Sequence, residues 1–314
     1  MLKIRPFRKG TDEEIYVRIY NSAFLDYDDI RGVTLQEVHA VEKAPSYNLS
    51  GLLIAEWDGQ PAGMVQALVD KLREEKKGFI QSLAVLPEFR RRGIAKKLVA
   101  EAVKSLKNRG MKVAGAWAQT DRAACTHLYE SFGFKRVRTT SLMKCSLTEK
   151  SDVNVNEAVV LREAMLKDDQ DVALINRLEN EAFKEHFNFR PLTLEETKYM
   201  LFEMPWYQHL KAWFTVLASQ PVGYIIAGID TRLNQEKHAK YGWILDIGVL
   251  KPFRRQKMGS TLMQSAMHYL RSVGMKNALL YVDDQNPTKA IKLYEKVGFK
   301  VFHSNTVYEL QLLA

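Results

Sequence analysis

The stretch VLPEFRRRGIAKKL, residues 85–98, joins the end of a strand-like run to a helix-like run through a loop with three consecutive arginines. A helix that begins near Gly93 would present its first N–H groups, which lack intrahelical partners, to that loop. The helix dipole adds about half a positive charge at the same place. Because three cationic side chains would repel one another there, the loop is typical of a site for a phosphate or pyrophosphate. The alternative is a solvated basic turn whose arginines point into water.

The same stretch returns in the second half of the chain. SLAVLPEFRRRGIAKKL (82–98) aligns without a gap on DIGVLKPFRRQKMGSTL (246–262). Further blocks recur in the same order: NSAFLDYDDIRGVTLQEV (21–38) as NEAFKEHFNFRPLTLEET (180–197), QPAG (60–63) as QPVG (220–223), and LYESFGFKRV (128–137) as LYEKVGFKVF (293–302). A spurious match would not keep that order, so the chain is predicted to hold two copies of one domain. We place them at 1–148 and 159–314, joined by a polar linker at 149–158.

Each copy predicts the same order of elements. A short strand (2–6 or 159–162) is followed by one or two helices, a hairpin, and a third strand that ends at Val85 or Val249. The arginine loop, a helix, another strand, a second helix and closing strands complete the copy. Strands and helices mixed in this way indicate an α/β or α+β domain around a sheet. The helix after the loop is supported by an apolar stripe of helical period and by a glycine where it should end: Leu98, Val99, Ala102, Val103, Leu106 and Gly110.

Composition narrows the class of protein further. The length of 314 residues suits two domains of roughly 150 residues, and no apolar run reaches the ~18–20 residues of a membrane span. Cys125 and Cys145 form no CxxC pair and the histidines are scattered, so no metal site is expected. The net charge of +9 favours an anionic partner, which could be nucleic acid, a phosphorylated cofactor or an acidic surface. We expect an intracellular, cytoplasmic protein that makes no membrane contact.

Residues 81–98 resemble the acyl-CoA-binding signature of the GNAT superfamily of N-acetyltransferases, Arg/Gln-x-x-Gly-x-Gly/Ala, here carried by Arg90, Gly93 and Ala95. LYESFGF (128–134) resembles the later motif of that family, in which a tyrosine lies near the CoA sulfur. The resemblance covers both halves of the chain. It implies two tandem GNAT domains, each a mixed, mostly antiparallel central sheet with a splayed pair of strands flanked by helices. It also implies acetyl-CoA as the acyl donor.

The resemblance assigns cofactor contacts in both copies. CoA would lie where two neighbouring strands splay apart, and backbone groups at the strand end would pair with its pantetheine arm and acetyl oxygen: Leu83, Ala84 and Val85, or Ile247, Gly248 and Val249. The loop and helix start would hold the pyrophosphate: Arg90, Arg91, Arg92, Gly93, Ile94, Ala95 and Lys96, or Arg254, Arg255, Gln256, Lys257, Met258, Gly259 and Ser260. Asn286, where the first copy has Asp121, would donate its amide to the cofactor.

Acetyl transfer to an amine needs a base, donors for the oxyanion and a proton for the departing thiolate. Tyr129 and Tyr294 are the candidate acids, unless each is merely a buried aromatic beside its Gly-Phe turn. Asp246, which stands where the first copy has Ser82, is the candidate base, unless it only hydrogen-bonds within the sheet. The acceptor-side block at 180–196 resembles that of tandem GNAT enzymes of the mycothiol synthase type, whose C-terminal half carries the reaction. This resemblance favours the second copy as the catalyst.

The predicted function is therefore N-acetyl transfer from acetyl-CoA to a primary amine, on a small molecule or a peptide, by direct attack in a ternary complex. A catalytically inactive CoA-binding sensor or scaffold is the alternative, because each copy departs from the family pattern at one position, Asp121 in the first and Lys257 in the second. Nucleic-acid binding is disfavoured, since no basic strand rich in aromatic residues is present.

Overall fold

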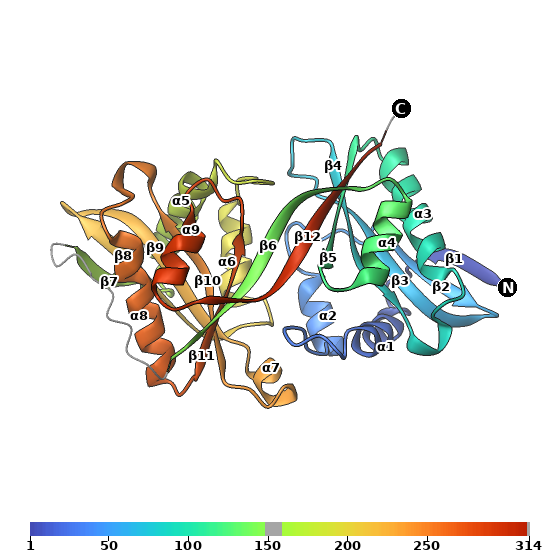
Figure 1. Cartoon of the computed structure of the whole chain (residues 1–314), viewed down its shortest axis with the longest axis horizontal. Coiled ribbons are helices and arrows are strands. Elements are labelled where there is room, and N and C mark those ends of the chain that lie inside the picture. Colours follow the sequence, from blue (N-terminus) through green and yellow to red (C-terminus); the bar gives the residue numbers. More distant parts are fainter. Residues whose placement is uncertain (148–158, 313–314) are drawn as a thin grey trace. The chain divides into compact units, whose positions relative to one another are not determined.

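The computed structural model describes residues 1–147 and 159–312, and the chain separates into two compact units (Figure 1). Unit 1 comprises Met1–Arg138 and Asn305–Ala314, and unit 2 comprises Thr139–Ser304. The predicted linker, 149–158, lies outside the described residues. No helix in the described part of the chain is long and apolar enough to cross a bilayer.

Unit 1 is a mixed, mostly antiparallel sheet with helices. Its elements are β1 (Leu2–Pro6), α1 (Glu13–Ala23), α2 (Leu35–Val41), β2 (Leu52–Trp57), β3 (Gln60–Val69), β4 (Lys77–Val85), η1 (Pro87–Phe89), α3 (Ile94–Asn108), β5 (Val113–Gln119), α4 (Ala123–Ser131) and the second part of β12 (Lys300–Gln311). The strand order is β1-β2-β3-β4-β5-β12, in which only the pair β4 and β5 runs parallel.

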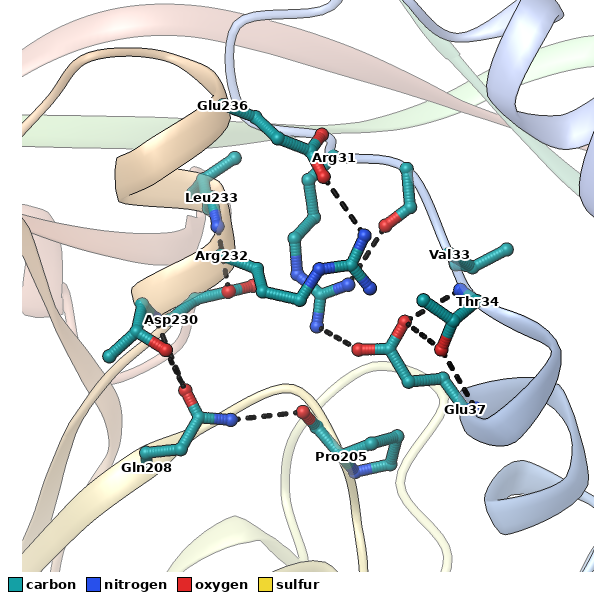
Figure 2. Close-up of polar contacts among 12 residues, drawn as sticks. Arg31, Val33, Thr34, Glu37, Pro205, Gln208, Asp230, Arg232, Leu233 and Glu236 are labelled. Atoms are coloured by element: carbon teal, nitrogen blue, oxygen red, sulfur yellow. Dashed lines mark hydrogen bonds and ion pairs between the residues drawn. The ribbon is translucent and has the colours of Figure 1, made fainter.

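Unit 2 repeats this plan. Its elements are most of β6 (Lys135–Ser146), β7 (Val160–Glu163), α5 (Asp169–Phe183), α6 (Leu194–Phe202), β8 (Gln208–Leu217), β9 (Gln220–Ile229), α7 (Thr231–Glu236), β10 (Tyr241–Val249), η2 (Lys251–Phe253), α8 (Met258–Ser272), β11 (Asn277–Asp283) and α9 (Ala290–Lys296). The strand order is β7-β8-β9-β10-β11-β6, and only β10 and β11 run parallel. Helix α7 has no counterpart in unit 1 and is capped by Asp230, whose side chain accepts from the Leu233 N–H at 2.9 Å (Figure 2).

The last strand of each repeat belongs to the unit of the other repeat. In β6, residues Thr140 to Ser146 pair with Asp283 to Asn277 of β11, so the end of the first repeat closes the sheet of unit 2. In β12, residues Asn305 to Gln311 pair with Gln119 to Val113 of β5, so the C-terminal strand closes the sheet of unit 1. Neither repeat therefore contains a complete sheet. The repeat pattern in the sequence did not predict this exchange.

The polar residues that recur in the first repeated block fix the conformation of the loop between α1 and α2. Arg31 binds the carboxylate of Glu37 at 2.8 Å, and Glu37 forms a capping box with Thr34 at the start of α2 (Figure 2). Asn21 closes the loop by accepting from the N–H of Val33 at 2.7 Å and donating to its carbonyl at 2.9 Å. In unit 2 the same contacts are made by Asn180, Arg190, Thr193 and Glu196 at the start of α6. The same polar residues recur because the two loops are closed by the same hydrogen bonds.

The predicted pair of splayed strands is present in both units. Strands β4 and β5 pair only from Lys77 to Ile80, against Val113 to Ala116. Strands β10 and β11 pair only from Tyr241 to Trp243, against Asn277 to Leu279. Beyond those residues the two strands separate. The splay leaves the second half of β4 and of β10 with one edge open.

The helix that follows the loop buries its predicted stripe against the sheet. Leu98, Val99, Ala102 and Leu106 of α3 are fully buried, and Val103 packs at the margin of the same core. Gly110, with φ +77°, follows the end of α3 in the left-handed conformation that a glycine C-cap adopts. The equivalent stripe on α8 is likewise buried, so both helix starts are held firmly behind their strands.

Candidate active site

The loop before α3 and the loop before α8 have the same backbone shape. Arg91 and Arg255 both have φ +65°, and Gly93 (φ +78°, ψ +1°) matches Lys257 (φ +65°, ψ +5°) at the N-cap. A Cβ at Gly93 would have no atom within 4 Å, which explains how the second copy accommodates a lysine there. The substitution therefore costs left-handed strain at Lys257 but does not change the course of the loop.

The arginines of the loop are largely engaged within the protein. Arg254 donates from Nε to the Val249 carbonyl at 2.9 Å and from its terminal nitrogen to the Ala182 carbonyl at 3.0 Å. Arg90 makes the same pair of contacts in unit 1, to Val85 at 3.2 Å and to Ala23 at 3.5 Å. The first arginine of each loop thus ties the end of the strand to the end of α1 or α5.

Arg92 lies over two aromatic rings, with its guanidinium carbon 5.3 Å from the Trp57 ring centre and 5.5 Å from that of Phe89. Cation–π contacts of this kind stabilise the charge without an anion. The repulsion among three arginines that the sequence suggested is therefore partly relieved inside unit 1.

The start of α8 keeps unpaired backbone donors. The first intrahelical bond runs from the Thr261 N–H to the Lys257 carbonyl at 3.0 Å, which leaves the amides of Met258, Gly259 and Ser260 without a helical acceptor. A Cβ on Gly259 would lie 2.9 Å from a methyl group of Leu293, so the glycine permits close packing of α8 against α9. These amides can accept an anionic group at the helix N-terminus.

A cavity of about 590 Å³ in unit 2 brings the predicted residues of the second copy together. Asp246 and Tyr294 both line it. So do all but one of the predicted cofactor contacts of this copy: Ile247, Gly248, Val249, Arg254, Arg255, Lys257, Met258, Gly259, Ser260 and Asn286. Gln256 is exposed outside the cavity and donates weakly to the Pro252 carbonyl at 3.4 Å. The lining also includes residues that the sequence did not indicate, namely Phe183, His186, Lys289, Lys292 and Lys296.

Asp246 is a half-buried carboxylate held from two sides. The hydroxyl of Tyr224 donates to one oxygen, and the N–H of Ile247 donates to the other at 2.9 Å. Burial raises the pKa of Asp246 to about 6, even though both hydrogen bonds favour the ionised form. Tyr224, on β9, is fully buried beneath Gly248, where a Cβ would approach its ring to 2.6 Å. Asp246 can therefore take up a proton near neutral pH.

Glu179, on α5, is a second carboxylate near Asp246. Burial raises its pKa to about 8, and the charges of Asp246 and Glu196 add to the effect. Neither Glu179 nor Tyr224 was among the residues predicted from the sequence. The repeat contained a signal, because the aligned residues in the first copy are Tyr20 and Met64. A position that is acidic in one copy and neutral in the other marks a difference in chemistry between the copies.

Tyr294, on α9, faces the same cavity as Asp246. Its side chain is buried, with 6% of the residue surface exposed, and burial together with the nearby Asp246 charge raises its pKa above the ordinary value. No hydrogen bond to its hydroxyl is found in the described part of the chain. The phenol is therefore protonated at neutral pH and able to donate its proton to a group in the cavity.

The model of the acetyltransferase (GNAT) family matches this chain twice, over residues 14–134 and 173–299. The chain belongs to that family. The two matches give it a tandem GNAT organisation, as the resemblance in the sequence implied, and make it an acetyltransferase.

Relatives and solved structures agree with this assignment. The mycothiol acetyltransferase of Renibacterium salmoninarum is 26% identical over 88% of this chain and 76% of its own length, and that of Actinosynnema mirum is 26% identical over 85% and 86%. A tandem GNAT protein from the clavulanic acid biosynthesis pathway superimposes with a TM-score of 0.77 over 100% of this chain and 99% of its own, at 15% identity. A GCN5-related N-acetyltransferase from Sphaerobacter thermophilus gives a TM-score of 0.71 at 19% identity, covering 100% and 96%.

The first GNAT copy has the same framework but different side chains at the matching positions. Tyr129 is buried, with 3% exposed, and packs 5.4 Å from the Phe134 ring and 5.6 Å from that of Tyr308. Around it, Ser82, Met64 and Tyr20 replace the residues that in unit 2 are Asp246, Tyr224 and Glu179. None of the three is an acid that could serve as the base at these positions.

Polar contacts of Arg122 join the start of α4 to the loop after α1 in the first copy. Arg122, at the start of α4, donates to the Asp26 carboxylate at 2.5 Å and to the Gln119 side chain at 3.2 Å, with its guanidinium carbon 4.2 Å from the Tyr27 ring centre. In unit 2 the residues that match Tyr27 and Asp121 are His186 and Asn286, and both line the open cavity. Pro287 stands in place of Arg122 and cannot form such a bridge.

Among the described residues no cluster of His, Cys, Asp and Glu of the kind that holds a metal ion is found.

Proposed function

We propose that this protein transfers the acetyl group of acetyl-CoA to a primary amine by direct attack in a ternary complex, and that unit 2 carries the reaction. The observation on which this rests is that Asp246 and Tyr294 line one cavity with the unpaired helix start of α8. A base, an acid and an anion site are then within one space. The names of the curated relatives support a small molecule as the acceptor.

The residues around the cavity suit the acyl donor. The amides of Met258, Gly259 and Ser260 would hold the pyrophosphate, with the cationic side chains of Arg255 and Lys257 beside them. Asn286 uses its side-chain oxygen to accept from the Thr288 N–H at 2.8 Å and hydroxyl at 2.7 Å, which leaves its NH₂ group to donate. The open edge of β10 from Ile247 to Val249 would pair with the pantetheine arm.

Asp246 and Tyr294 would divide the proton transfers between them. Asp246, with a pKa of about 6, accepts a proton from the attacking nitrogen at neutral pH. Tyr294 gives its proton to the departing sulfur, because a thiol leaves more readily than a thiolate. N–H groups along the open strand edge beyond Ile247, whose own N–H donates to Asp246, would stabilise the oxyanion. The first copy keeps the loop from Arg90 to Lys96 and the strand end from Leu83 to Val85, but we assign turnover to the second copy because only it carries the acids.

Release of free thiol from acetyl-CoA in the presence of a panel of small amines, with the acetylated product detected by mass spectrometry, tests this proposal. Asp246→Asn should reduce the rate by about a hundredfold or more, since asparagine has the size and planar shape of aspartate but cannot act as a base. The matched change in the first copy, Ser82→Ala, should leave the rate within about twofold. Binding of acetyl-CoA without thiol release from any amine would instead indicate a CoA sensor.

A further inference from the structure

Glu179 lies on the face of α5 that is turned toward the cavity. Phe183 and His186, four and seven residues further on, line the cavity directly. Ala182, three residues further on, packs against β10, where a Cβ built on Gly248 would lie 3.0 Å from the Ala182 methyl group. His186 lies beyond the end of α5, but residues three and four apart share a helix face, so Ala182 and Phe183 position Glu179 beside the part of β10 that carries Asp246.

The Glu179 side chain has neither an ion pair nor a hydrogen bond in the part of the chain that the structure describes. The nearby cations are used elsewhere. Arg190 is bound to Glu196 of α6 at 2.7 Å, and Arg254 donates to backbone carbonyls. The other titratable groups near this point are Asp246 on β10, Glu196 on α6, Tyr224 on β9 and Tyr294 on α9, and none of them is a cation. Two carboxyl groups, Glu179 and Asp246, are therefore close together without a cation bound to Glu179, although Arg255 and Lys257 line the same cavity.

Burial and the like charge of Asp246 oppose ionisation of Glu179, so in the free chain this carboxyl group is mostly protonated at neutral pH, and a bound cation would favour its ionised form. We propose that Glu179 and Asp246 together bind the acceptor amine as its ammonium ion, with Glu179 as a positioning residue and Asp246 as the base. This inference rests on the proposed function and specifies its substrate class as strongly basic amines. An alkylamine is almost wholly ammonium at neutral pH, so the pair captures the abundant form.

The proton balance of this scheme closes. One proton of the ammonium passes to Asp246, which frees the lone pair of the nitrogen for attack. As the N–C bond forms, the C–S bond breaks, and the sulfur takes the proton of Tyr294. The second proton lost by the nitrogen replaces the one that Tyr294 has given up. Asp246 returns its proton to solvent, so one proton is released for each amide formed.

Steady-state kinetics of Glu179→Gln with two classes of amine tests the inference. The probes are ethanolamine and propylamine as strongly basic acceptors, and methoxyamine as an acceptor that is neutral at neutral pH. For the basic amines we expect KM to rise by about thirtyfold or more, the lower end of what removal of one partner from a buried charge pair costs, with a smaller change in kcat. For methoxyamine KM should stay unchanged. Glu181→Gln is the matched control, since Glu181 is exposed on the same helix and paired with Lys184. Equal effects on both classes, or no effect of Glu179→Gln, would overturn the inference.

A second measurement does not depend on the choice of acceptor. A carboxyl group whose pKa is higher in the folded chain stabilises the fold below its unfolded pKa and loses that contribution as pH rises through the folded value. With the pKa of Glu179 raised from 4.5 to about 8, the wild-type Tm should fall as pH rises from about 4.5 to about 8 and then level off, and Glu179→Gln should remove much of that fall. Added ethanolamine should oppose the fall in the wild type but not in the variant. A Tm profile of Glu179→Gln that follows the wild type would contradict the paired arrangement.

The two proposals fail in different ways. If Asp246→Asn retains acetyl transfer, the assignment of the catalytic base in unit 2 is wrong. If Asp246→Asn abolishes transfer while Glu179→Gln behaves as the wild type toward basic amines, the assignment of Asp246 as the base is retained. Only the proposed binding of the ammonium ion by Glu179 is then wrong.

Discussion

Arg122 donates a hydrogen bond of 2.5 Å to the carboxylate of Asp26, and this pair joins the start of α4 to the loop that follows α1 in unit 1. Arg122 also donates to the Asp26 carbonyl at 3.1 Å and lies over the ring of Tyr27. The matching walls in unit 2 enclose the open cavity. Because His186, which lines the cavity of unit 2, matches Tyr27 at the bridge, we expect the bridge to hinder CoA binding in the first copy.

We accordingly expect one CoA to bind per chain, in unit 2, and a second to bind when the bridge is removed by Arg122→Ala. Isothermal titration calorimetry with CoA gives the stoichiometry directly. Labelling of Cys125 by a thiol reagent gives an independent readout, because this half-buried thiol on α4 should react faster in Arg122→Ala and be protected again by CoA. Arg136→Ala is the control, since Arg136 forms an exposed pair with Glu130 in the same unit. A wild-type stoichiometry of two would show that the bridge does not exclude the cofactor.

The rate of acetyl transfer should follow the ionisation of the Asp246 and Glu179 carboxyl groups. Asp246 must be deprotonated to act as a base, and burial raises its pKa to about 6. Below that pH, kcat/KM should fall by about tenfold for each pH unit. At higher pH the apparent pKa values belong to the pair, because Glu179 titrates nearby. A profile that stays flat down to pH 5 would indicate that neither carboxyl group is the base.

Tyr294→Phe and Tyr129→Phe form a matched pair of tests for which copy is the catalyst. Both hydroxyls are buried, and both pKa values are raised, so each tyrosine keeps its proton at neutral pH. Tyr294 shares a cavity with the Asp246 carboxylate, whereas the first copy has Ser82 at the position of Asp246. Tyr294→Phe should lower kcat by about a hundredfold, the lower range for loss of a general acid, and Tyr129→Phe should leave it within about threefold. Loss of activity in Tyr129→Phe alone would transfer the reaction to unit 1.

Gly248→Ala should impair the site through Tyr224. The added Cβ would lie 2.6 Å from a ring carbon of Tyr224 and 3.0 Å from the Ala182 methyl group, so the ring has to move. Overpacking of this kind costs about 1–3 kcal/mol of unfolding free energy. Displacement of the Tyr224 hydroxyl also removes a donor from Asp246, which should raise the pKa of Asp246 and shift the acid limb of the pH–rate profile upward. If the Tm falls but the pH–rate profile does not shift, the change has disturbed the packing around Tyr224 without affecting the hydrogen bond to Asp246. Gly93→Ala is the contrasting change in unit 1, because its Cβ would meet no neighbouring atom and only the positive φ opposes it.

The arginine loop and the helix that follows it could be predicted from the sequence because they depend on contacts between residues close along the chain. The repeat located two domains, and the helical stripe with Gly110 located α3. The order Val-x-Pro, arginines and a small residue indicated a helix start that binds phosphate, and the family match confirms the GNAT fold that this order implied. Asp246 and Tyr294 were indicated in the same way, and their roles in catalysis stay predictions.

Only the tertiary structure decided which side chains meet. Glu179 and Tyr224 lie on α5 and β9, far in sequence from Asp246, and no local pattern in the sequence placed them beside it. The exchange of β6 and β12 between units likewise depends on backbone pairing over more than a hundred residues, as in the register of Asn305 against Gln119. The sequence by itself determined the elements, the repeat and the loop, because backbone conformation and helix capping are set by near neighbours. The fold alone determined the charge and the openness of each cleft, because pKa values and cavities arise from residues that come together only when the chain is folded.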